Sequence, residues 1–357
     1  MQCLMSLHQT LQGNKRKAKS PARHREAYRS RLVRLGCEVM EDRVLLSAAL
    51  PDYHFTAPAL VAGTTQHNAP SSIGTFTKTP GTTTQSITMP LPTAPAVAHP
   101  TSPGTYQVVN GTLFGPNGPQ YSDVKQSSYL GDCWLDASLA EAAYRDPALI
   151  RNMITPLGQY NENGTTVQLY DVRLCTAGGP AREILVDNEF AMYGGTEYNA
   201  QVLNGVLWVA LAEKAYVEAA AAGYVVNSYT GSFAQVPDNY QDVNGGYPYW
   251  ALNAITGNAS TEYDSVNNGV INAEMAVNGG LVVLVTGSTP SSSLVVPDHS
   301  YAVLADNPGA TWQFTLYNPW NVGSIYDWNG QDVYGSVFYC NQAFLDQNFD
   351  GFGFAVA

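Results

Sequence analysis

Residues 51–105 are rich in Thr, Pro, Ser and Ala and carry little charge, and this composition limits where the chain can fold. Such a stretch cannot bury enough apolar surface to offset the conformational entropy lost on ordering. We therefore predict a disordered linker at 51–105. The globular body then starts near residue 106 of a 357-residue chain, which leaves room for one or two packed domains.

The distribution of charge changes near residue 50, where the predicted linker begins. Ten of the 17 Lys and Arg residues lie in residues 1–50, while the remainder holds seven basic and 25 acidic residues. An acidic body repels phosphate backbones, so we expect no nucleic-acid partner for the globular part. We interpret 1–50 as a basic targeting segment; a disordered basic tail, or a head that contacts nucleic acid or anionic lipid, is the alternative.

The sequence MEDRVLLSA at residues 40–48 resembles the LEPRxLLSA element found near the N-terminus of many exported proteins of certain bacteria. It departs from that element by Met for Leu and Asp for Pro. The resemblance implies an exported or cell-surface protein in a bacterium, with a cytoplasmic location as the alternative. No stretch of 18 apolar residues is present, so we expect no transmembrane span.

The cysteines and histidines limit the kinds of site that the predicted body can hold. The five cysteines form no CxxC pair, and of the six histidines only His299 lies in the predicted body, so a metal site built from several His or Cys is not expected there. No GxSxG, P-loop, HExxH, GxGxxG or EF-hand pattern occurs. Cys175 and Cys340 are either buried thiols or a disulfide, and the oligomeric state is left open.

The hydrophobic pattern predicts an α+β body. Helices are expected at 134–144 and 203–221, the second apolar nearly all round, and shorter ones near 250–255 and 270–278. Two strands are expected within 165–187, and others at 281–286, 299–305 and 312–318. Because helices come early and strands late, we predict two lobes, 106–243 and 244–357.

Cys133 begins the first predicted helix, where the positive end of the helix dipole favours a thiolate. Gly131 allows a tight entry into the helix and Asp132 is a candidate N-cap. A cysteine at a helix start is also often a small buried hydrophobic residue. The sequence around Cys133 therefore suggests a nucleophile without requiring one.

The strands at 299–305 and 312–318 add a second argument. If residues 306–311 form the turn of an antiparallel hairpin, Ala305 pairs with Trp312 and, counting outward, His299 pairs with Asn318. Opposed side chains have Cβ atoms about 4.5–5.5 Å apart. This register would place the Asn318 amide beside the His299 imidazole, which is the contact that a Cys–His–Asn triad needs. The alternative is an ordinary hairpin with polar ends.

Three blocks resemble the calpain-type, papain-like cysteine peptidases over nearly all of 121–357: GDCWL at 131–135, WVALAEKAY at 208–216 and NPW at 318–320, with His299 upstream of the last. The resemblance implies a helical nucleophile lobe, a β-rich His/Asn lobe and an active site in the cleft between them. It implies a cysteine endopeptidase acting on protein or peptide substrates. The implied site residues are Cys133, His299 and Asn318 for catalysis, Gln126 and the Cys133 N–H for the oxyanion hole, and Trp320 for shielding.

The chain also departs from the family pattern. Gln126 lies seven residues before Cys133 where six are usual, and Asp136 stands at a usually apolar position. The chemistry needs no cofactor, and calcium is expected only as a possible activator, because the family's calcium ligands have no assignable counterparts here. One alternative is a catalytically inactive fold that serves as a binding or surface module. Another is a related reaction, such as transglutamination or amide hydrolysis of a non-protein substrate.

Overall fold

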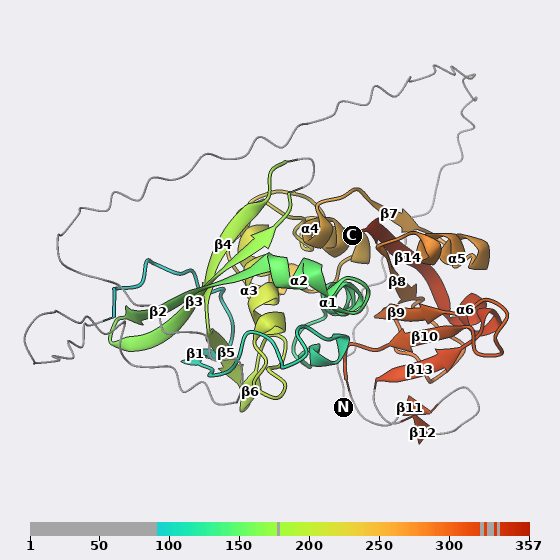
Figure 1. Cartoon of the computed structure of the whole chain (residues 1–357), viewed down its shortest axis with the longest axis horizontal. Coiled ribbons are helices and arrows are strands. Elements are labelled where there is room, and N and C mark those ends of the chain that lie inside the picture. The colour runs from blue at the N-terminus through green and yellow to red at the C-terminus, as the bar shows by residue number, and fades with distance from the viewer. Residues whose placement is uncertain (1–90, 177–178, 322–324, 327–331, 334–335) are drawn as a thin grey trace, which may run out of the picture. The chain divides into compact units, whose positions relative to one another are not determined.

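The computed structural model describes residues 91–357 except 177–178, 322–324, 327–331 and 334–335 (Figure 1). The expected targeting segment, its element at 40–48 and most of the expected linker lie outside the described residues. The described chain is a mixture of helices and strands, so the α+β class is confirmed.

The helices are η1 (Tyr121–Asp123), α1 (Cys133–Arg145), α2 (Pro147–Met153), α3 (Trp208–Ala221), η2 (Tyr240–Val243), α4 (Pro248–Thr256), α5 (Asn268–Ala276) and α6 (Gln342–Asn348). The strands are β1 (Thr105–Val108), β2 (Ile154–Glu162), β3 (Thr165–Leu174), β4 (Arg182–Asp187), β5 (Glu189–Tyr193), β6 (Thr196–Glu197), β7 (Ser260–Tyr263), β8 (Gly280–Thr286), β9 (Ser300–Asp306), β10 (Phe314–Tyr317), β11 (Ile325–Tyr326), β12 (Asp332–Val333), β13 (Val337–Cys340) and β14 (Phe349–Val356).

The largest sheet has the strand order β13-β10-β9-β8-β14-β7, and its neighbouring strands are antiparallel. Its side chains alternate between two hydrophobic clusters, as the two-residue period of a strand requires. In β8, Leu281 and Val283 join the cluster that includes α1 and α4, whereas Val282 and Leu284 join the one that includes α5 and α6. Helices therefore cover both faces of this sheet (Figure 1).

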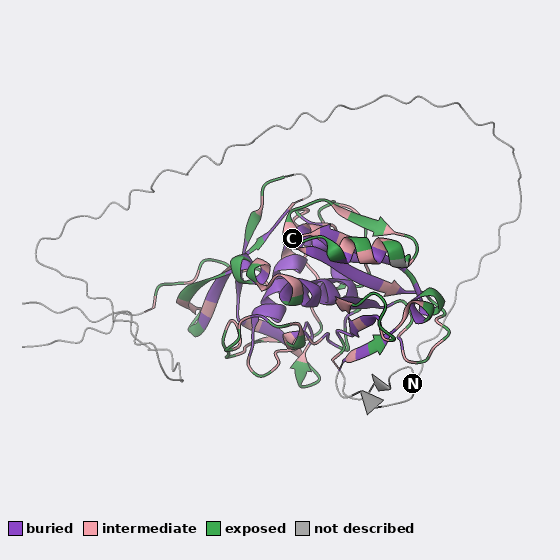
Figure 2. Cartoon of the chain, turned by 45° about the vertical axis from the view of Figure 1, so that its right-hand side comes forward, coloured by how far each residue is buried: buried purple, intermediate pink, exposed green. Residues whose placement is uncertain are grey.

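Helix α1 packs against β8, β9 and α4, and α3 lies in the same hydrophobic cluster. Figure 2 shows that the buried residues gather where these helices meet the large sheet. The predicted central position of α3 is confirmed, because even Glu213 and Lys214 in it are 0% exposed. The helix begins at Trp208, later than predicted. The preceding residue, Leu207, is held in a loop because its N–H donates to Thr112 O at 3.0 Å.

The other predicted elements are present with small shifts at their ends, but the part before residue 244 is less helical than expected. It also contains two three-stranded sheets, β2-β3-β4 and β1-β5-β6. Strand β2 was not predicted from the sequence. Pro156 and Gly158 interrupt its alternation and coincide with a β-bulge, and most of its residues are exposed or half-buried, so it lacks a clear apolar face.

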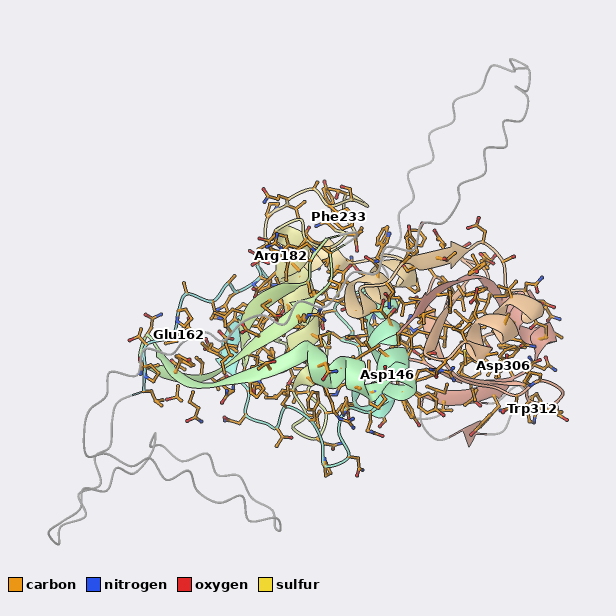
Figure 3. All side chains as sticks on the ribbon, turned by 45° about the horizontal axis from the view of Figure 1, so that its top comes forward. Asp146, Glu162, Arg182, Phe233, Asp306 and Trp312 are labelled. Atoms are coloured by element: carbon orange, nitrogen blue, oxygen red, sulfur yellow. The ribbon has the colours of Figure 1, made fainter. Side chains whose placement is uncertain are left out.

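Strands β9 and β10 form the predicted antiparallel hairpin, but the predicted register is wrong. Ala305 pairs with Thr315 rather than with Trp312, and a β-bulge follows Thr315. The connection runs over residues 307–313 and is longer than the expected six residues. The N–H of Asn307 donates to the carbonyl of Gln313 at 2.8 Å within it. Trp312 consequently lies in the loop at this end of the hairpin (Figure 3).

Residues 91–104 contact the core, although the sequence predicted them as part of the linker. Thr93 forms a parallel bridge with Asn161, and the N–H of Thr101 donates to Asp238 O at 2.9 Å. The disordered linker remains a prediction for the residues before 91. The described part of the linker nevertheless belongs to the folded structure.

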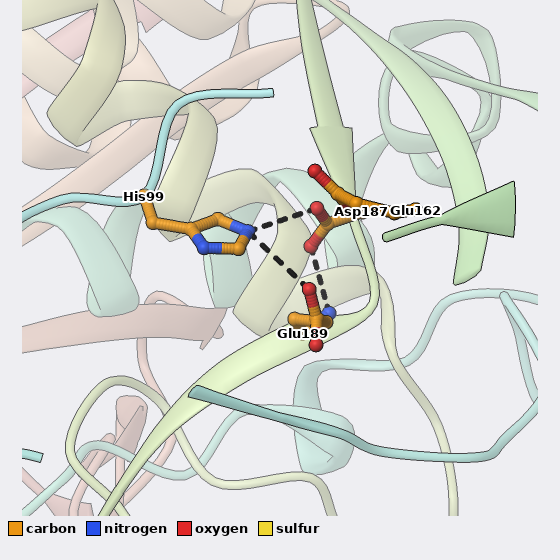
Figure 4. Close-up of side chains that lie close together, drawn as sticks. All are labelled: His99, Glu162, Asp187 and Glu189. Atoms are coloured by element: carbon orange, nitrogen blue, oxygen red, sulfur yellow. Dashed lines mark hydrogen bonds and ion pairs between the residues drawn. The ribbon is translucent and has the colours of Figure 1, made fainter. Parts of the chain in front are cut away.

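A partly buried network of His99 and three carboxyl groups holds this N-terminal segment (Figure 4). His99 Nε2 lies 3.0 Å from Asp187 Oδ2 and 3.7 Å from Glu189 Oε2, and Glu162 approaches from the end of β2. The Lys214 ammonium, 0% exposed, donates to Asp187 Oδ1 at 2.7 Å. His99, which the sequence placed outside the body, therefore joins the core through Asp187.

Three cysteines lie in the described residues, Cys133, Cys175 and Cys340, and all are buried free thiols. The disulfide alternative for Cys175 and Cys340 is therefore wrong. Among the helices of the described residues, none combines the length and apolar character that crossing a bilayer would require.

The ion pair between Lys214 and Asp187 gives a stability prediction. Lys214→Met should lower the free energy of unfolding by about 3–5 kcal/mol, because it leaves the Asp187 carboxylate buried without its ammonium partner. Denaturant unfolding followed by circular dichroism measures this loss. Combining Lys214→Met with Asp187→Leu should recover part of it. An unchanged denaturant midpoint for Lys214→Met would contradict the assignment of this pair.

Candidate active site

The structure brings the residues predicted from the sequence together around one pocket. A cavity of about 520 Å³ is lined by Cys133, His299, Gln126 and Trp320, among others. Asn318 is 3% exposed and contacts His299. Residues from α1, from the start of β9 and from the loop after β10 therefore meet in one place.

Cys133 is the first residue of α1 and is 9% exposed. Its position at the positive end of the helix favours a thiolate. The expected role of Asp132 as a side-chain cap is wrong: Asp132 occupies the N-cap position, but its side chain accepts no capping hydrogen bond. Its main-chain carbonyl accepts from the N–H groups of Leu135 and Asp136 instead.

Gly131 is required by a close approach rather than by an unusual backbone angle. Its N–H donates to Asn244 Oδ1 at 2.8 Å, and its carbonyl accepts from Gly245 N at 2.8 Å. A Cβ on Gly131 would lie 2.6 Å from Asn244 Oδ1, which is too close. The two bonds fix the chain that leads into Cys133.

His299 is held at both of its main-chain groups by Thr286 at the end of β8. The His299 N–H donates to Thr286 Oγ1 at 2.9 Å, and Thr286 N donates to His299 O at 2.9 Å. The preceding Asp298 has φ of +50°, in the left-handed region that few non-glycine residues adopt. Strand β8 and this turn therefore determine where the imidazole points.

His299 Nε2 lies 2.8 Å from Asn318 Oδ1. The same Oδ1 also accepts the main-chain N–H of Trp320 at 3.0 Å, which identifies it as the amide oxygen. An amide oxygen only accepts, so the His299 Nε2 must carry a proton and donate it. The predicted base–orienter contact is therefore present, and it leaves Nδ1 as the basic nitrogen.

This contact does not arise from the expected direct pairing of His299 with Asn318. Tyr317 pairs with Ala302, and Asn318 lies beyond the last paired residue of β10. The N–H of Asn318 donates to Ser336 O at 2.8 Å, which holds the backbone while its side chain reaches His299. The predicted neighbourhood was correct, but the register that predicted it was not.

Trp320 lies against the imidazole, as expected for a shielding residue. Its ring centroid is 5.0 Å from that of His299, and the two planes are tilted by 59°. The side chain is 39% exposed, so its outer part faces solvent. The ring thus contacts the His299 imidazole, and the shielding role of Trp320 stays a prediction.

Gln126 lines the pocket despite its unusual spacing from Cys133. Its N–H donates to Pro319 O at 2.8 Å, and its Nε2 donates to Leu130 O at 2.8 Å. The Gln126 side chain also acts on the Asp132 carboxyl group, whose pKa it lowers through a hydrogen bond. The residues between Gln126 and Cys133 include Tyr129, which is half-exposed and packs against Tyr193 and Tyr198.

Burial shapes the protonation of the two reactive groups. Burial raises the pKa of the Cys133 thiol to about 11, and the main-chain N–H and hydroxyl of Ser300 oppose that rise. Burial lowers the pKa of His299 to about 4, and its hydrogen bond to Asn318 opposes that fall. When a proton passes from sulfur to imidazole, both charge together and attract each other.

Three fully buried carboxyl groups, those of Asp132, Asp136 and Glu213, lie beside the first turn of α1. Burial raises the pKa of Asp132 to about 6, against the effect of a hydrogen bond with Glu213. Burial raises the pKa values of Asp136 and Glu213 well above their usual range, and neighbouring carboxylates add to both. The side chain of Asp136, which the sequence left unplaced, therefore faces a polar cluster and not solvent.

Two groups of described residues bring ligand atoms within 4.8 Å of one another, as a metal ion would require. One is the cluster of Asp132, Asp136 and Glu213. The other is the His99 network, in which the Lys214 ammonium already supplies positive charge. Neither group contains the pocket residues His299 and Asn318.

Sequence analysis missed two supporting residues of the site, Ser300 and Thr286. Ser300 directly follows His299, is 2% exposed, and lowers the pKa of Cys133 through its N–H and hydroxyl. A hydroxyl beside a predicted catalytic histidine was the available signal for Ser300. Thr286 gave no such signal, because its role depends on how β8 lies against β9.

In a comparison with known families, the model for the calpain family cysteine protease matches residues 103–336. A comparison with curated proteins found no match.

The low pKa of His299 predicts a pH dependence in a Cys133→Ala variant, which removes the thiol from the pair. Between pH 6.5 and 4 the unfolded chain binds a proton at His299 that the native protein does not. The free energy of unfolding should therefore fall by about 3 kcal/mol as the pH drops through this range. Denaturant unfolding at several pH values measures it.

The matched control is the double variant Cys133→Ala/His299→Gln, which retains the buried carboxyl groups and lacks the titrating imidazole. The difference in unfolding free energy between the two variants isolates His299. If that difference is the same at pH 6.5 and at pH 4, the imidazole is not buried as described.

Proposed function

We propose that this chain, which belongs to the calpain family of cysteine proteases, is an active endopeptidase that uses Cys133 as its nucleophile. The observation that carries the proposal is the bond from His299 Nε2 to Asn318 Oδ1 beside a pocket that Cys133 lines. This bond orients the imidazole and leaves Nδ1 free to exchange a proton with the sulfur. In this proposal, residues 106–243 and 244–357 form two lobes with the active site in the cleft between them.

Acylation begins when the Cys133 proton moves to His299 Nδ1. The thiolate attacks the scissile carbonyl carbon and forms a C–S bond, while the carbonyl electrons move to oxygen. The resulting oxyanion is stabilised by the Cys133 N–H and by the side-chain amide of Gln126. The tetrahedral species then collapses, the C–N bond breaks, and His299 gives its proton to the leaving amine.

Deacylation repeats the same steps with water. His299 removes a proton from a water molecule, which attacks the thioester carbonyl, and the C–S bond breaks to release the acid product and the Cys133 thiol. Asn318 maintains the imidazole orientation through both halves of the reaction. Trp320 limits the access of water to the His299–Asn318 bond.

The substrates in this proposal are proteins or peptides. The chemistry needs no cofactor. Calcium is retained as a possible activator, although no described residue is assigned to hold it. We further propose that the basic segment at 1–50 directs export or surface display in a bacterium, on the grounds of its charge and of the element at 40–48.

Peptide hydrolysis by the full chain tests the proposed function, with and without calcium. Cys133→Ala should abolish hydrolysis. His299→Ala should lower kcat/KM by about 10²–10⁴, the range for loss of a general acid–base. Asn318→Ala should cause a smaller loss, because the imidazole remains but its orientation is no longer fixed.

Alkylation with iodoacetamide gives an independent readout that does not require the right substrate. Mass spectrometry should find Cys133 labelled faster than an ordinary thiol, and His299→Ala should slow this labelling. The buried thiols Cys175 and Cys340 serve as internal controls. Ordinary reactivity at Cys133 with no hydrolysis would favour the inactive binding module, and product analysis with an amine acceptor would reveal transglutamination.

A further inference from the structure

The ladder between β8 and β9 ends earlier than the strands do. Its antiparallel pairs run from Val285–Ser300 to Val283–Ala302. Continuing outward, the next pair would be Val282 with Val303, but it does not form. Two main-chain N–H groups at the centre of a buried sheet would therefore lack their usual strand partner, which is costly unless another acceptor is supplied.

The side chain of Glu141 on α1 supplies that acceptor. Val282 N–H donates to Glu141 Oε1 at 3.2 Å, and the main-chain N–H of Val303 lies close enough to lower the pKa of the same carboxyl group. Glu141 is 0% exposed. A helix side chain thus takes the place of strand pairing between β8 and β9.

Arg145 adds a second link one helical turn later. Its Nε donates to Gly280 O at 3.1 Å, and its Nη2 donates to Met275 O at 2.8 Å. Glu141 and Arg145 therefore fix α1 to β8 at two points. The hydrophobic effect is non-directional, whereas directional hydrogen bonds favour one register of the helix on the sheet.

These links connect the two halves of the active site. Cys133 lies eight residues before Glu141 on the same helix, about 12 Å along its axis. Strand β8 continues from Val282 to Thr286, which holds both main-chain groups of His299. The position of Glu141 on β8 and β9 is therefore transmitted along two rigid elements to the sulfur and to the imidazole.

We propose that Glu141 is a positioning residue that sets the register of α1 against β8 and β9, and thereby aligns Cys133 with His299. The proposal rests on the proposed cysteine-protease function. Glu141 touches neither Cys133 nor the pocket, so its effect on catalysis passes entirely through the placement of α1. A misplacement of about 1 Å in a site of this kind can cost on the order of 100-fold in rate.

A matched pair of variants separates the hydrogen bonds from the charge. Burial raises the pKa of Glu141 to about 8, so the side chain is mainly protonated at neutral pH. Glu141→Gln has the same shape as the protonated acid and keeps an acceptor oxygen. Glu141→Met has a similar length and no strong acceptor, so the Val282 N–H loses its partner.

The experiment uses the full chain and measures three quantities for each variant: kcat and KM for a peptide, the pH profile of Cys133 alkylation between pH 5 and 9, and circular dichroism. Glu141→Gln should remain within about threefold of wild type. Glu141→Met should lower kcat by at least about tenfold with little change in KM. Cys133 of the wild type should be alkylated rapidly below pH 8. In Glu141→Met, the rate of alkylation should instead follow the titration of an isolated thiol.

A merely structural role for Glu141 would lower stability but leave the alkylation profile and kcat of the folded protein unchanged, and that result would overturn the proposal. If Glu141→Met does not fold, the Glu141→Asp variant tests the proposal instead. The shorter acid should lower kcat at constant KM, and an unchanged kcat would overturn the proposal. Slow alkylation of Cys133 in the wild type would instead refute the proposed protease function, which keeps the two failures distinct.

Discussion

The packing of α1 against β8 and β9 determines whether the described pocket contains a working set of groups. The sulfur is on the helix, while the imidazole directly precedes β9 and the amide follows β10. No element carries more than one of the three, so their geometry is a property of tertiary packing. The large sheet keeps His299 and Asn318 together, and α1 adds the Cys133 thiol from a different layer.

The interior around this contact disfavours isolated charge. Burial keeps the carboxyl groups of Asp136, Glu213 and Glu141 protonated above their usual pH range, and it lowers the pKa of the His299 imidazole. A lone thiolate would be costly in such surroundings. A thiolate formed together with an imidazolium is less so, because the two charges attract strongly where water is scarce. The donors of Ser300 and the helix N-terminus reduce the remaining cost at Cys133.

Local pattern was enough to predict the α+β class, most helices, and the neighbourhood of His299 and Asn318. It failed where the outcome depends on contacts across the fold. The register of β9 and β10 depends on the Asn307–Gln313 bond and on a β-bulge, and neither has a distinct sequence signal. In the same way, nothing local to Glu141 indicates that its carboxyl group will meet the unpaired end of a strand ladder. His99 looked like a linker residue because its partner Asp187 is 88 residues away.

The spacing of Gln126 shows how a departure in sequence can leave a position intact. The segment between Gln126 and Cys133 turns so that Tyr129 packs outward on Tyr193 and Tyr198, and the Ser127 hydroxyl accepts the Tyr129 N–H at 3.1 Å. The extra length is therefore taken up on the aromatic side of the loop. Meanwhile, the bond from Gln126 N to Pro319 O ties this residue to the chain between Asn318 and Trp320. Because that bond is made by the main chain, it holds Gln126 at the pocket whatever path the following residues take.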